Sequence, residues 1–289
     1  MDLKKRQKTR TIKCKDNGRS SDAVSANFVL GCYNKSGIKP CSYCYVDRWN
    51  RKKMYFATNP DDILNECDKW VQDKPWKKIP NQVGKKYYWI DIGCSADVNF
   101  TWKDYDWVYV FDWFKQHPKL AATFATKFVN SRLLEYSPEG KIRCRMSLSP
   151  QCLVDKLEKG TSPIIKRISF IPKLINAGYE AHINLSPVVV YKEWWKDYIK
   201  LFKQLSELDL TNVKLEVIFL THHEETHYRN LELWSDAEEL LWKPEWQEVK
   251  RSQYGGVNVR YKHQYKSKLV AMFKRLVDDH LGLEIRYIF

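Results

Sequence analysis

Apolar segments of two lengths alternate along most of this chain. Six short apolar runs have the size and composition of buried strands, at residues 26–30, 87–94, 121–128, 143–148, 181–188 and 213–220. Longer segments at 60–72, 103–116, 163–176 and 191–207 carry helix signals, such as the N-caps Asn59 and Ser162. Strands that alternate with helices predict parallel strands joined by helical crossovers. We therefore expect an α/β fold, and six strands indicate a partial (β/α)6 barrel.

The pattern changes near the C-terminal end. Residues 251–261 predict a hairpin or loop around Gly255 and Gly256, followed by a helix at 267–280 and a final strand at 283–288. Residues 1–19 hold eight Lys or Arg and two Asp or Glu with few apolar residues, which predicts a basic, flexible arm. The predicted organisation is thus an arm at 1–19, a barrel at 20–242 and a C-terminal extension at 243–289, to which the resemblance described below assigns a part in substrate binding.

Composition narrows the functional classes. The 289 residues are 44% hydrophobic, enough for a sizeable core, and no apolar run approaches the roughly 18 residues that a membrane span needs. The start of the chain has no apolar signal core, so we expect a cytoplasmic protein. A net charge of +14, with 12 Trp and 17 Tyr, favours a nucleic-acid partner, although a basic solvated surface would give the same charge.

Three cysteines lie within a thirteen-residue stretch just after the first predicted strand: Cys32, Cys41 and Cys44. The last two form a C-x2-C pair, whose spacing lets both thiolates reach one soft metal centre. Three thiolates on an iron–sulfur cluster would leave one iron open for another ligand. The alternatives are a zinc knuckle or unrelated buried thiols, but a zinc site usually takes its ligands from two paired motifs and the chain has no second C-x2-C.

The cysteine loop resembles that of the radical S-adenosylmethionine (SAM) enzymes, in which an aromatic residue, here Tyr43, precedes the third cysteine. Eight residues separate Cys32 from Cys41 where that superfamily has three. The longer loop adds little to the entropic cost of bringing its ends together, since each doubling of length adds only about 0.6 kcal/mol. The resemblance implies a partial barrel of radical SAM type. Reactive groups of such barrels gather at the C-terminal ends of the strands, where Cys94 and Lys127 are predicted to lie.

A closer resemblance extends from about residue 26 to the end of the chain. It is to the spore photoproduct lyase family, radical SAM enzymes that reverse a methylene-bridged thymine dimer in DNA. The similar stretches are residues 41–45, 94–97, 126–128, 143–147, 160–163 with 167–168, 177–179 and, more loosely, 185–198 and 215–220.

This resemblance implies roles for individual residues. Cys32, Cys41 and Cys44 would hold a 4Fe-4S cluster, Cys94 would donate a hydrogen atom, and Tyr45 would relay it. Residues implied to contact SAM are Tyr43, Ser95, Lys127 and Ser147, and those implied to contact the substrate are Arg251, Tyr254, Arg260 and Tyr261. DNA or another nucleic acid is the implied partner, with an electron donor such as flavodoxin or ferredoxin. Gly93 is expected to leave room beside Cys94 for a ligand.

Three departures from the family pattern keep other functions open. Ala96 stands where the family has a small hydroxyl residue, residues 221–224 replace a family segment, and residues 254–258 follow the family loop only roughly. A related radical SAM enzyme acting on another DNA or RNA substrate is therefore an alternative. A basic nucleic-acid-binding protein with a structural cluster is another.

A rival motif lies at residues 223–227, which read His-Glu-Glu-Thr-His. This H-E-x-x-H pattern is typical of zinc hydrolases, with His223 and His227 as ligands and Glu224 as general base. However, residues 221–230 are polar almost throughout, whereas the helix of such an enzyme is largely buried. Chance polar surface is the alternative interpretation.

Overall fold

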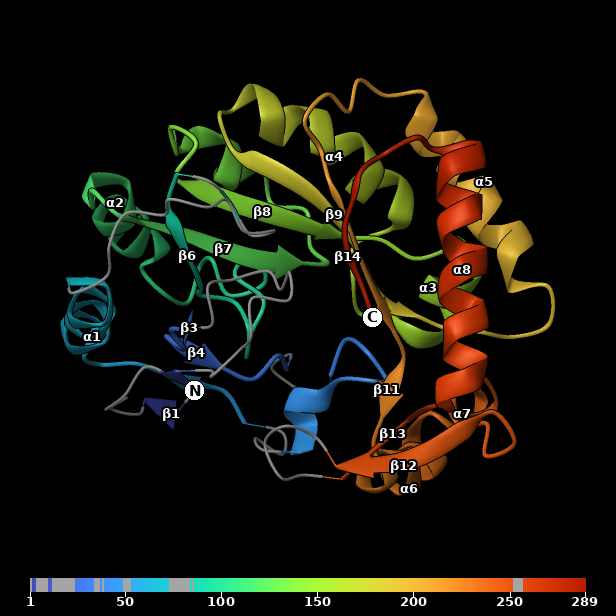
Figure 1. Ribbon diagram of the computed structural model, residues 1–289. Helices are drawn as coiled ribbons and strands as arrows, with labels where there is room; N and C mark the ends of the chain where they lie inside the picture. Colours follow the sequence, from blue (N-terminus) through green and yellow to red (C-terminus); the bar gives the residue numbers. More distant parts are fainter. Residues whose placement is uncertain are drawn as a thin grey trace.

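The computed structural model describes residues 2–3, 10–11, 24–33, 37, 39–48, 53–72, 84, 86–251 and 257–289. Its centre is an eight-stranded sheet in the order β14 (Ile285–Ile288), β10 (Leu215–Phe219), β9 (Glu180–Val188), β8 (Ile142–Ser147), β7 (Leu120–Thr126), β6 (Tyr88–Asp91), β3 (Val24–Ser25) and β2 (Arg10–Thr11). All neighbouring pairs from β14 to β3 are parallel, and β2 is antiparallel to β3. The sheet curls, as Figure 1 shows, which confirms the predicted partial barrel of six β/α units.

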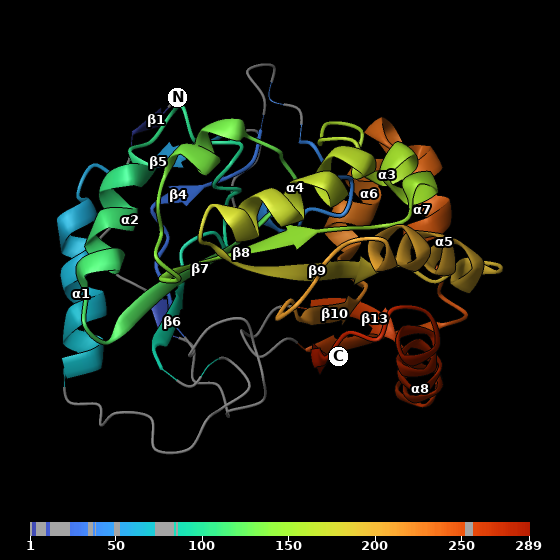
Figure 2. The same ribbon diagram turned by 90° about the horizontal axis from the view of Figure 1, so that it is seen from above.

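Helices form the crossovers between the parallel strands. They are α1 (Pro60–Gln72), α2 (Trp107–Gln116), α3 (Gln151–Leu157), α4 (Ile164–Asn176), α5 (Trp194–Ser206) and α8 (His263–His280). In Figure 2, α4 lies along β8 and β9, and Figure 1 shows α8 beside α5. Among the described residues, no helix is both long and apolar enough to cross a membrane.

The two faces of the sheet differ in polarity. Side chains alternate along β8, so that Cys144 and Met146 lie on one face and Arg143 and Arg145 on the other. The apolar face is packed against helices, as in the contact between the rings of Phe124 on β7 and Phe111 on α2, whose centroids are 5.8 Å apart. The polar face is therefore the inner side of the curled sheet. The C-terminal edge of this inner face carries the strand ends where reactive groups are expected.

The start of the sheet differs from the prediction. The expected strand at 26–30 is split, because Ala26 N still donates to Asp91 O of β6 whereas Phe28 O accepts from Ala57 N. The chain thereby leaves the main sheet, and β4 (Val29–Leu30) joins a small second sheet with β5 (Tyr55–Phe56) and β1 (Asp2–Leu3). This switch carries the chain directly into the cysteine loop.

The C-terminal region contains the predicted hairpin. Strands β12 (Gln247–Arg251) and β13 (Val257–Tyr261) pair antiparallel, and β11 (Thr221–His222) joins β13 on its other side. The turn itself, with Gly255 and Gly256, lies outside the described residues. Two helices, α6 (Glu224–Leu233) and α7 (Ser235–Leu241), connect β11 to β12. The predicted final strand forms β14 and pairs with β10 of the main sheet, while the predicted division into an arm, a barrel and an extension stays a prediction.

Glu216, at the middle of the inner face, is fully buried and is the centre of a charged network. Its carboxylate pairs with the guanidinium of Arg286 from β14, lies 3.5 Å from Arg145 Nη1, and accepts a 2.9 Å hydrogen bond from Tyr287. Arg145 also pairs with Asp91 at 2.9 Å. Burial would raise the pKa of Glu216, but the charges of Arg286 and Arg145 hold that pKa far below its usual value. The carboxylate thus stays ionised, and the network around it links β6, β8, β10 and β14.

We predict that Glu216→Gln destabilises the fold by about 3–5 kcal/mol, because two buried guanidinium groups lose their shared counter-charge. Urea unfolding measures the loss. The matched control is Glu284→Gln, which removes the exposed 2.8 Å pair with Lys214 and should change stability by about 0–1 kcal/mol. Equal losses for the two variants would contradict the assigned role of the network.

Candidate active site

The three cysteines of the loop lie close together in the structure. None of Cys32, Cys41 and Cys44 forms a disulfide with another described residue, and Cys44 N donates to Cys41 O at 3.4 Å. Burial raises the pKa of the Cys32 thiol, and the charges of Asp97, Cys44 and Cys41 raise it further. The positive charge of Lys127 lowers the pKa of the same thiol. Three neighbouring cysteine thiols beside a lysine fit the donor set of a cluster that has one open iron.

Backbone contacts hold this loop against the connection between β8 and α4. Ser42 N donates to Leu157 O at 2.8 Å, and Gly160 N donates to Pro40 O at 3.2 Å. A Cβ atom at Gly160 would lie 2.8 Å from Pro40 Cα, closer than such atoms approach. Gly160 is therefore required for the close approach of the two segments.

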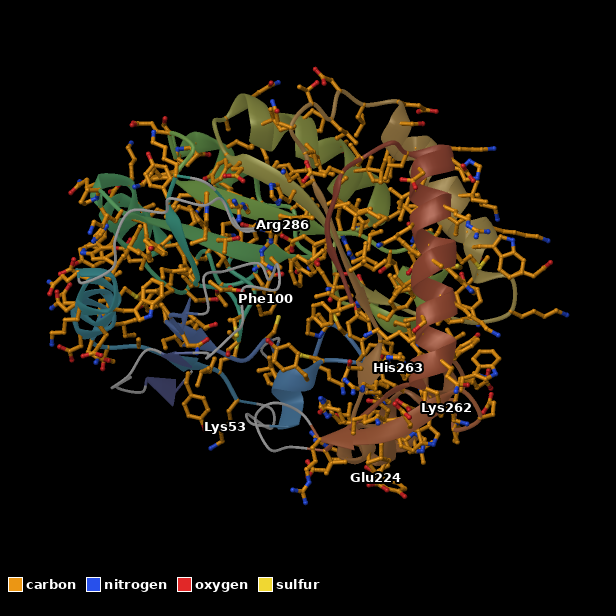
Figure 3. All side chains as sticks on the ribbon, in the orientation of Figure 1. Lys53, Phe100, Glu224, Lys262, His263 and Arg286 are labelled. Atoms are coloured by element: carbon orange, nitrogen blue, oxygen red, sulfur yellow. The ribbon has the colours of Figure 1, made fainter. Side chains whose placement is uncertain are left out.

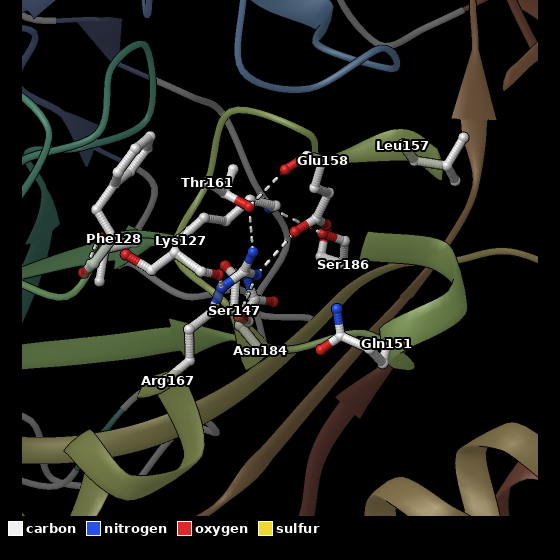
Figure 4. A network of polar contacts seen from close by, with 12 residues as sticks. Lys127, Phe128, Ser147, Gln151, Leu157, Glu158, Thr161, Arg167, Asn184 and Ser186 are labelled. Atoms are coloured by element: carbon white, nitrogen blue, oxygen red, sulfur yellow. Dashed lines mark hydrogen bonds and ion pairs between the residues drawn. The ribbon is translucent and has the colours of Figure 1, made fainter. Parts of the chain in front are cut away.

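A buried polar network runs from Tyr43 in the cysteine loop to the end of β8, and Figure 4 shows its members Glu158, Arg167 and Ser147. Glu158 Oε1 accepts from the hydroxyl of Tyr43, and Glu158 Oε2 pairs with Arg167 Nη1 at 2.7 Å. Arg167 also donates to Ser147 O at 3.0 Å and to Ser162 O at 2.7 Å. Sequence reasoning assigned no role to Glu158. The one feature of the sequence that could have pointed to Glu158 is its position just before the predicted turn at residues 160–163.

Asp97 fixes the end of β7 and with it Lys127. One of its carboxylate oxygens accepts from Lys127 N at 2.8 Å, and the other accepts from Thr126 Oγ1 at 2.7 Å. The Lys127 side chain reaches across the inner face, where its Nζ donates to Ser186 O at 3.4 Å and lies 5.5 Å from the centre of the Tyr43 ring. Sequence reasoning had given Asp97 no function of its own. The structure shows that it positions Lys127.

Ser147 lies on the same inner face at the end of β8. Its hydroxyl accepts a hydrogen bond from Asn184 Nδ2 at 3.3 Å, and its side chain is buried. Ser147, Lys127 and Ser186 thus come from three adjacent strand ends, as Figure 4 shows. Polar groups at the C-terminal ends of parallel strands are the usual setting for ligand binding in such sheets.

Cys94 and Tyr45 meet at the end of β6. The Tyr45 hydroxyl donates to Cys94 O and lies 3.9 Å from Cys94 Sγ, and Ser95 Oγ is also 3.9 Å from that sulfur. Burial, reinforced by Asp91, raises the pKa of the Cys94 thiol, so it keeps its proton at neutral pH. The expected room beside Gly93 is occupied, because a Cβ there would lie 2.8 Å from Phe124 Cβ.

The four residues expected at the substrate fall into different places. Arg251 and Arg260 are exposed on β12 and β13, as a nucleic-acid contact requires. Tyr261 is only 2% exposed, and its hydroxyl accepts from Val190 N at 2.8 Å, so its side chain joins β13 to the core. Tyr254 lies outside the described residues.

The residues of the H-E-x-x-H motif point in different directions. His223 precedes α6 and directs its Nδ1 at Val257 O, 3.2 Å away, whereas His227 directs its Nδ1 at Glu238. Glu224 is exposed at the outer edge of the molecule (Figure 3). An exposed carboxylate is a poor general base for a water held in a closed site, so this geometry does not favour a hydrolase.

Comparisons with known proteins agree with one another. A sequence model of the spore photoproduct lyase family matches residues 9–288. The chain is 26% identical over 208 residues to spore photoproduct lyase of Bacillus subtilis (strain 168), which covers 71% of this chain and 57% of the relative. It is 25% identical over 211 residues to spore photoproduct lyase of Clostridium acetobutylicum, covering 71% and 59%. The matched part thus spans little more than half the length of these curated relatives.

Solved structures show the same fold. A spore photoproduct lyase complexed with dinucleoside spore photoproduct superposes with a TM-score of 0.81 at 20% identity, covering 99% of this chain and 82% of the other. A mutant spore photoproduct lyase with bound AdoMet and the same dinucleoside has a TM-score of 0.80 at 18% identity, covering 96% and 81%.

We predict that Gly160→Ala lowers both stability and the iron content of the reconstituted protein, because the new methyl group pushes Pro40 and the cysteine loop away. An overpacked contact of this kind costs about 1–3 kcal/mol. The control is Gly140→Ala, where no atom lies within 4 Å of the new Cβ and only the positive φ of 70° is unfavourable. Gly140→Ala should therefore lose some stability but no iron. Normal iron content in folded Gly160→Ala protein would contradict the assigned role.

Proposed function

Because the chain belongs to the spore photoproduct lyase family, we propose that it is a radical SAM lyase that reverses a methylene-bridged thymine dimer in DNA. The observation that carries the proposal is that the three thiols of the cysteine loop lie beside Lys127 and Cys94, which stand at the ends of the parallel strands β7 and β6. Solved spore photoproduct lyases with the dinucleoside lesion bound share that fold. A related radical SAM reaction on another DNA or RNA substrate remains the alternative.

Cys32, Cys41 and Cys44 would hold the 4Fe-4S cluster, and Lys127 and Ser147 would bind the amino-acid end of SAM. Lys127 is a compact cation suited to a carboxylate, and Asp97 fixes its backbone beside the thiols. Tyr43 offers a flat face to the adenine ring, and Ser95 a hydroxyl beside it. When bound, the cluster and SAM would supply the radical chemistry of the reaction.

Cys94 would return a hydrogen atom to the substrate radical. The raised pKa keeps the thiol protonated, and a weak S–H bond releases its hydrogen more readily than an O–H bond. Tyr45, whose hydroxyl lies 3.9 Å from the sulfur, would relay the hydrogen atom. The role of the protein here is to hold both groups at one strand end and to exclude stray hydrogen donors.

DNA is the proposed partner, because the chain carries a net charge of +14 and exposes Arg251 and Arg260 on the hairpin. Tyr254 in the same hairpin is proposed to reach the lesion, whereas the buried Tyr261 would support the hairpin from beneath. A flavodoxin or ferredoxin as the electron donor and a cytoplasmic location stay predictions.

We predict that Cys32→Ala, Cys41→Ala and Cys44→Ala each lose iron and SAM cleavage, because each removes one of only three proposed ligands. Iron analysis after anaerobic reconstitution and detection of 5′-deoxyadenosine measure the two effects. Cys152→Ala is the control, since this exposed thiol contacts Tyr191 and Asp197 instead. Full iron and full SAM cleavage in Cys32→Ala would remove this residue from the ligand set.

We predict that Cys94→Ala retains iron and SAM cleavage but gives little correct product. The substrate radical still forms and is then quenched by the wrong partner, because the hydrogen donor is missing. Mass spectrometry of products from a dinucleoside lesion in deuterated solvent measures this: wild type and Cys152→Ala should give normal product containing deuterium. Normal product at the normal rate from Cys94→Ala would show that the thiol only packs.

A further inference from the structure

Three side chains of the types that bind metals, two of them buried and one partly buried, converge outside the site described above. They are His222 on β11, His227 on α6 and Glu238 on α7. His222 Nε2 lies 3.1 Å and His227 Nδ1 lies 2.6 Å from the same oxygen, Glu238 Oε2. The ligand atoms of all three residues lie within 4.8 Å of one another.

These separations are close to those around a small metal ion. In a tetrahedral zinc site with bonds of about 2.0–2.2 Å, neighbouring ligand atoms are roughly 3.3–3.5 Å apart. The 3.1 Å contact needs almost no change, and the 2.6 Å contact needs a shift of less than about 1 Å. Two imidazoles and one carboxylate are a common set of zinc ligands, and a water or the second oxygen of Glu238 would complete the coordination.

The surroundings resemble those of a closed site. His222 is 0% exposed and Glu238 is 4% exposed. The Trp242 ring stacks on His227 with centroids 4.1 Å apart and lies edge-on to His222 at 6.0 Å. With its face on one imidazole and its edge toward the other, the Trp242 indole shields both from water and limits the orientations that they can take.

Asn230 and Lys39 connect this cluster to the cysteine loop. Asn230 Nδ2 donates to Glu238 Oε1 and, at 3.0 Å, to Ser42 O between Cys41 and Tyr43. Lys39 Nζ donates to Asn230 Oδ1 at 2.9 Å and to Ser42 O at 3.0 Å. A hydrogen bond from a neighbouring side chain to a metal-ligating carboxylate holds that carboxylate in place.

We propose that His222, His227 and Glu238 bind a divalent metal ion of the zinc class, which braces the cysteine loop through Asn230. The ion would join β11, which directly follows β10 of the main sheet, to the helices α6 and α7. The site differs from the H-E-x-x-H motif, since it uses His222 in place of His223 and has no exposed base. It does not depend on the proposed function.

The test measures metal content in full-length protein whose iron–sulfur cluster has been loaded first, so that the loop cysteines are occupied. After growth with added zinc, we expect about one zinc per chain in wild type. His227→Ala and Glu238→Gln should lose that zinc, and the matched control His223→Ala should keep it. Two ligand variants are used because one of them alone could fail to fold.

Cobalt(II) added in place of zinc identifies the ligands. The expected spectrum has d–d bands from nitrogen and oxygen ligands, and these bands disappear in His227→Ala and Glu238→Gln. Cobalt bands with thiolate charge-transfer character would place the ion on cysteines and overturn the proposal. Failure of wild type to retain either metal at equimolar concentration would overturn it as well, and would leave these side chains as a hydrogen-bonded network.

Discussion

The buried ion pair of Glu158 and Arg167 is the interaction on which the arrangement of the candidate site depends. Arg167 donates to the carbonyl of Ser147 at the end of β8, and Glu158 accepts from Tyr43 in the cysteine loop. Two charges removed from water are stable only when their remaining donors and acceptors are also satisfied. The pair therefore fixes the loop relative to the strand end, and neither can move without breaking several bonds.

The division of the sheet into an apolar outer face and a polar inner face explains how these groups reach one another. Phe124 and Cys144 pack beneath the helices, and the residues next to them in sequence face inward. Middle positions of the inner face carry the paired charges around Glu216, and the strand ends carry Lys127 and Ser147. The charged side chains around Glu216 neutralise one another, so Lys127 and Ser147 at the strand ends remain available for a ligand.

Hydrogen bonds hold the cysteine loop on two sides. Leu157 and Gly160 hold it from the side of β8, and Asn230 holds it from the side of α6, where the proposed metal site lies. Helix α6 also packs against the short helix η1 (Tyr45–Arg48) that follows Cys44. A loop with eight residues between its first two cysteines has more freedom than a short one, and these two supports restrict it.

The sequence by itself determined the succession of strands and helices, because apolar periodicity and caps are local properties. The spacing of the cysteines also singled out the cysteine loop, whereas the roles of Cys94 and Lys127 came from the resemblance to the family. The sequence predicted one strand at 26–30, where the chain instead passes from β3 of the main sheet to β4 of the small sheet, and only tertiary pairing decides that.

Only the tertiary structure decided which side chains meet. Glu158 and Arg167, Asp97 and Lys127, and His227 and Glu238 are 9, 30 and 11 residues apart, and no periodic pattern links them. The H-E-x-x-H spacing selected His223, whereas the fold turned that ring to Val257 and brought in His222 from β11. Such pairs form because the fold buries polar groups that must then find partners, and this requirement acts through space and not along the chain.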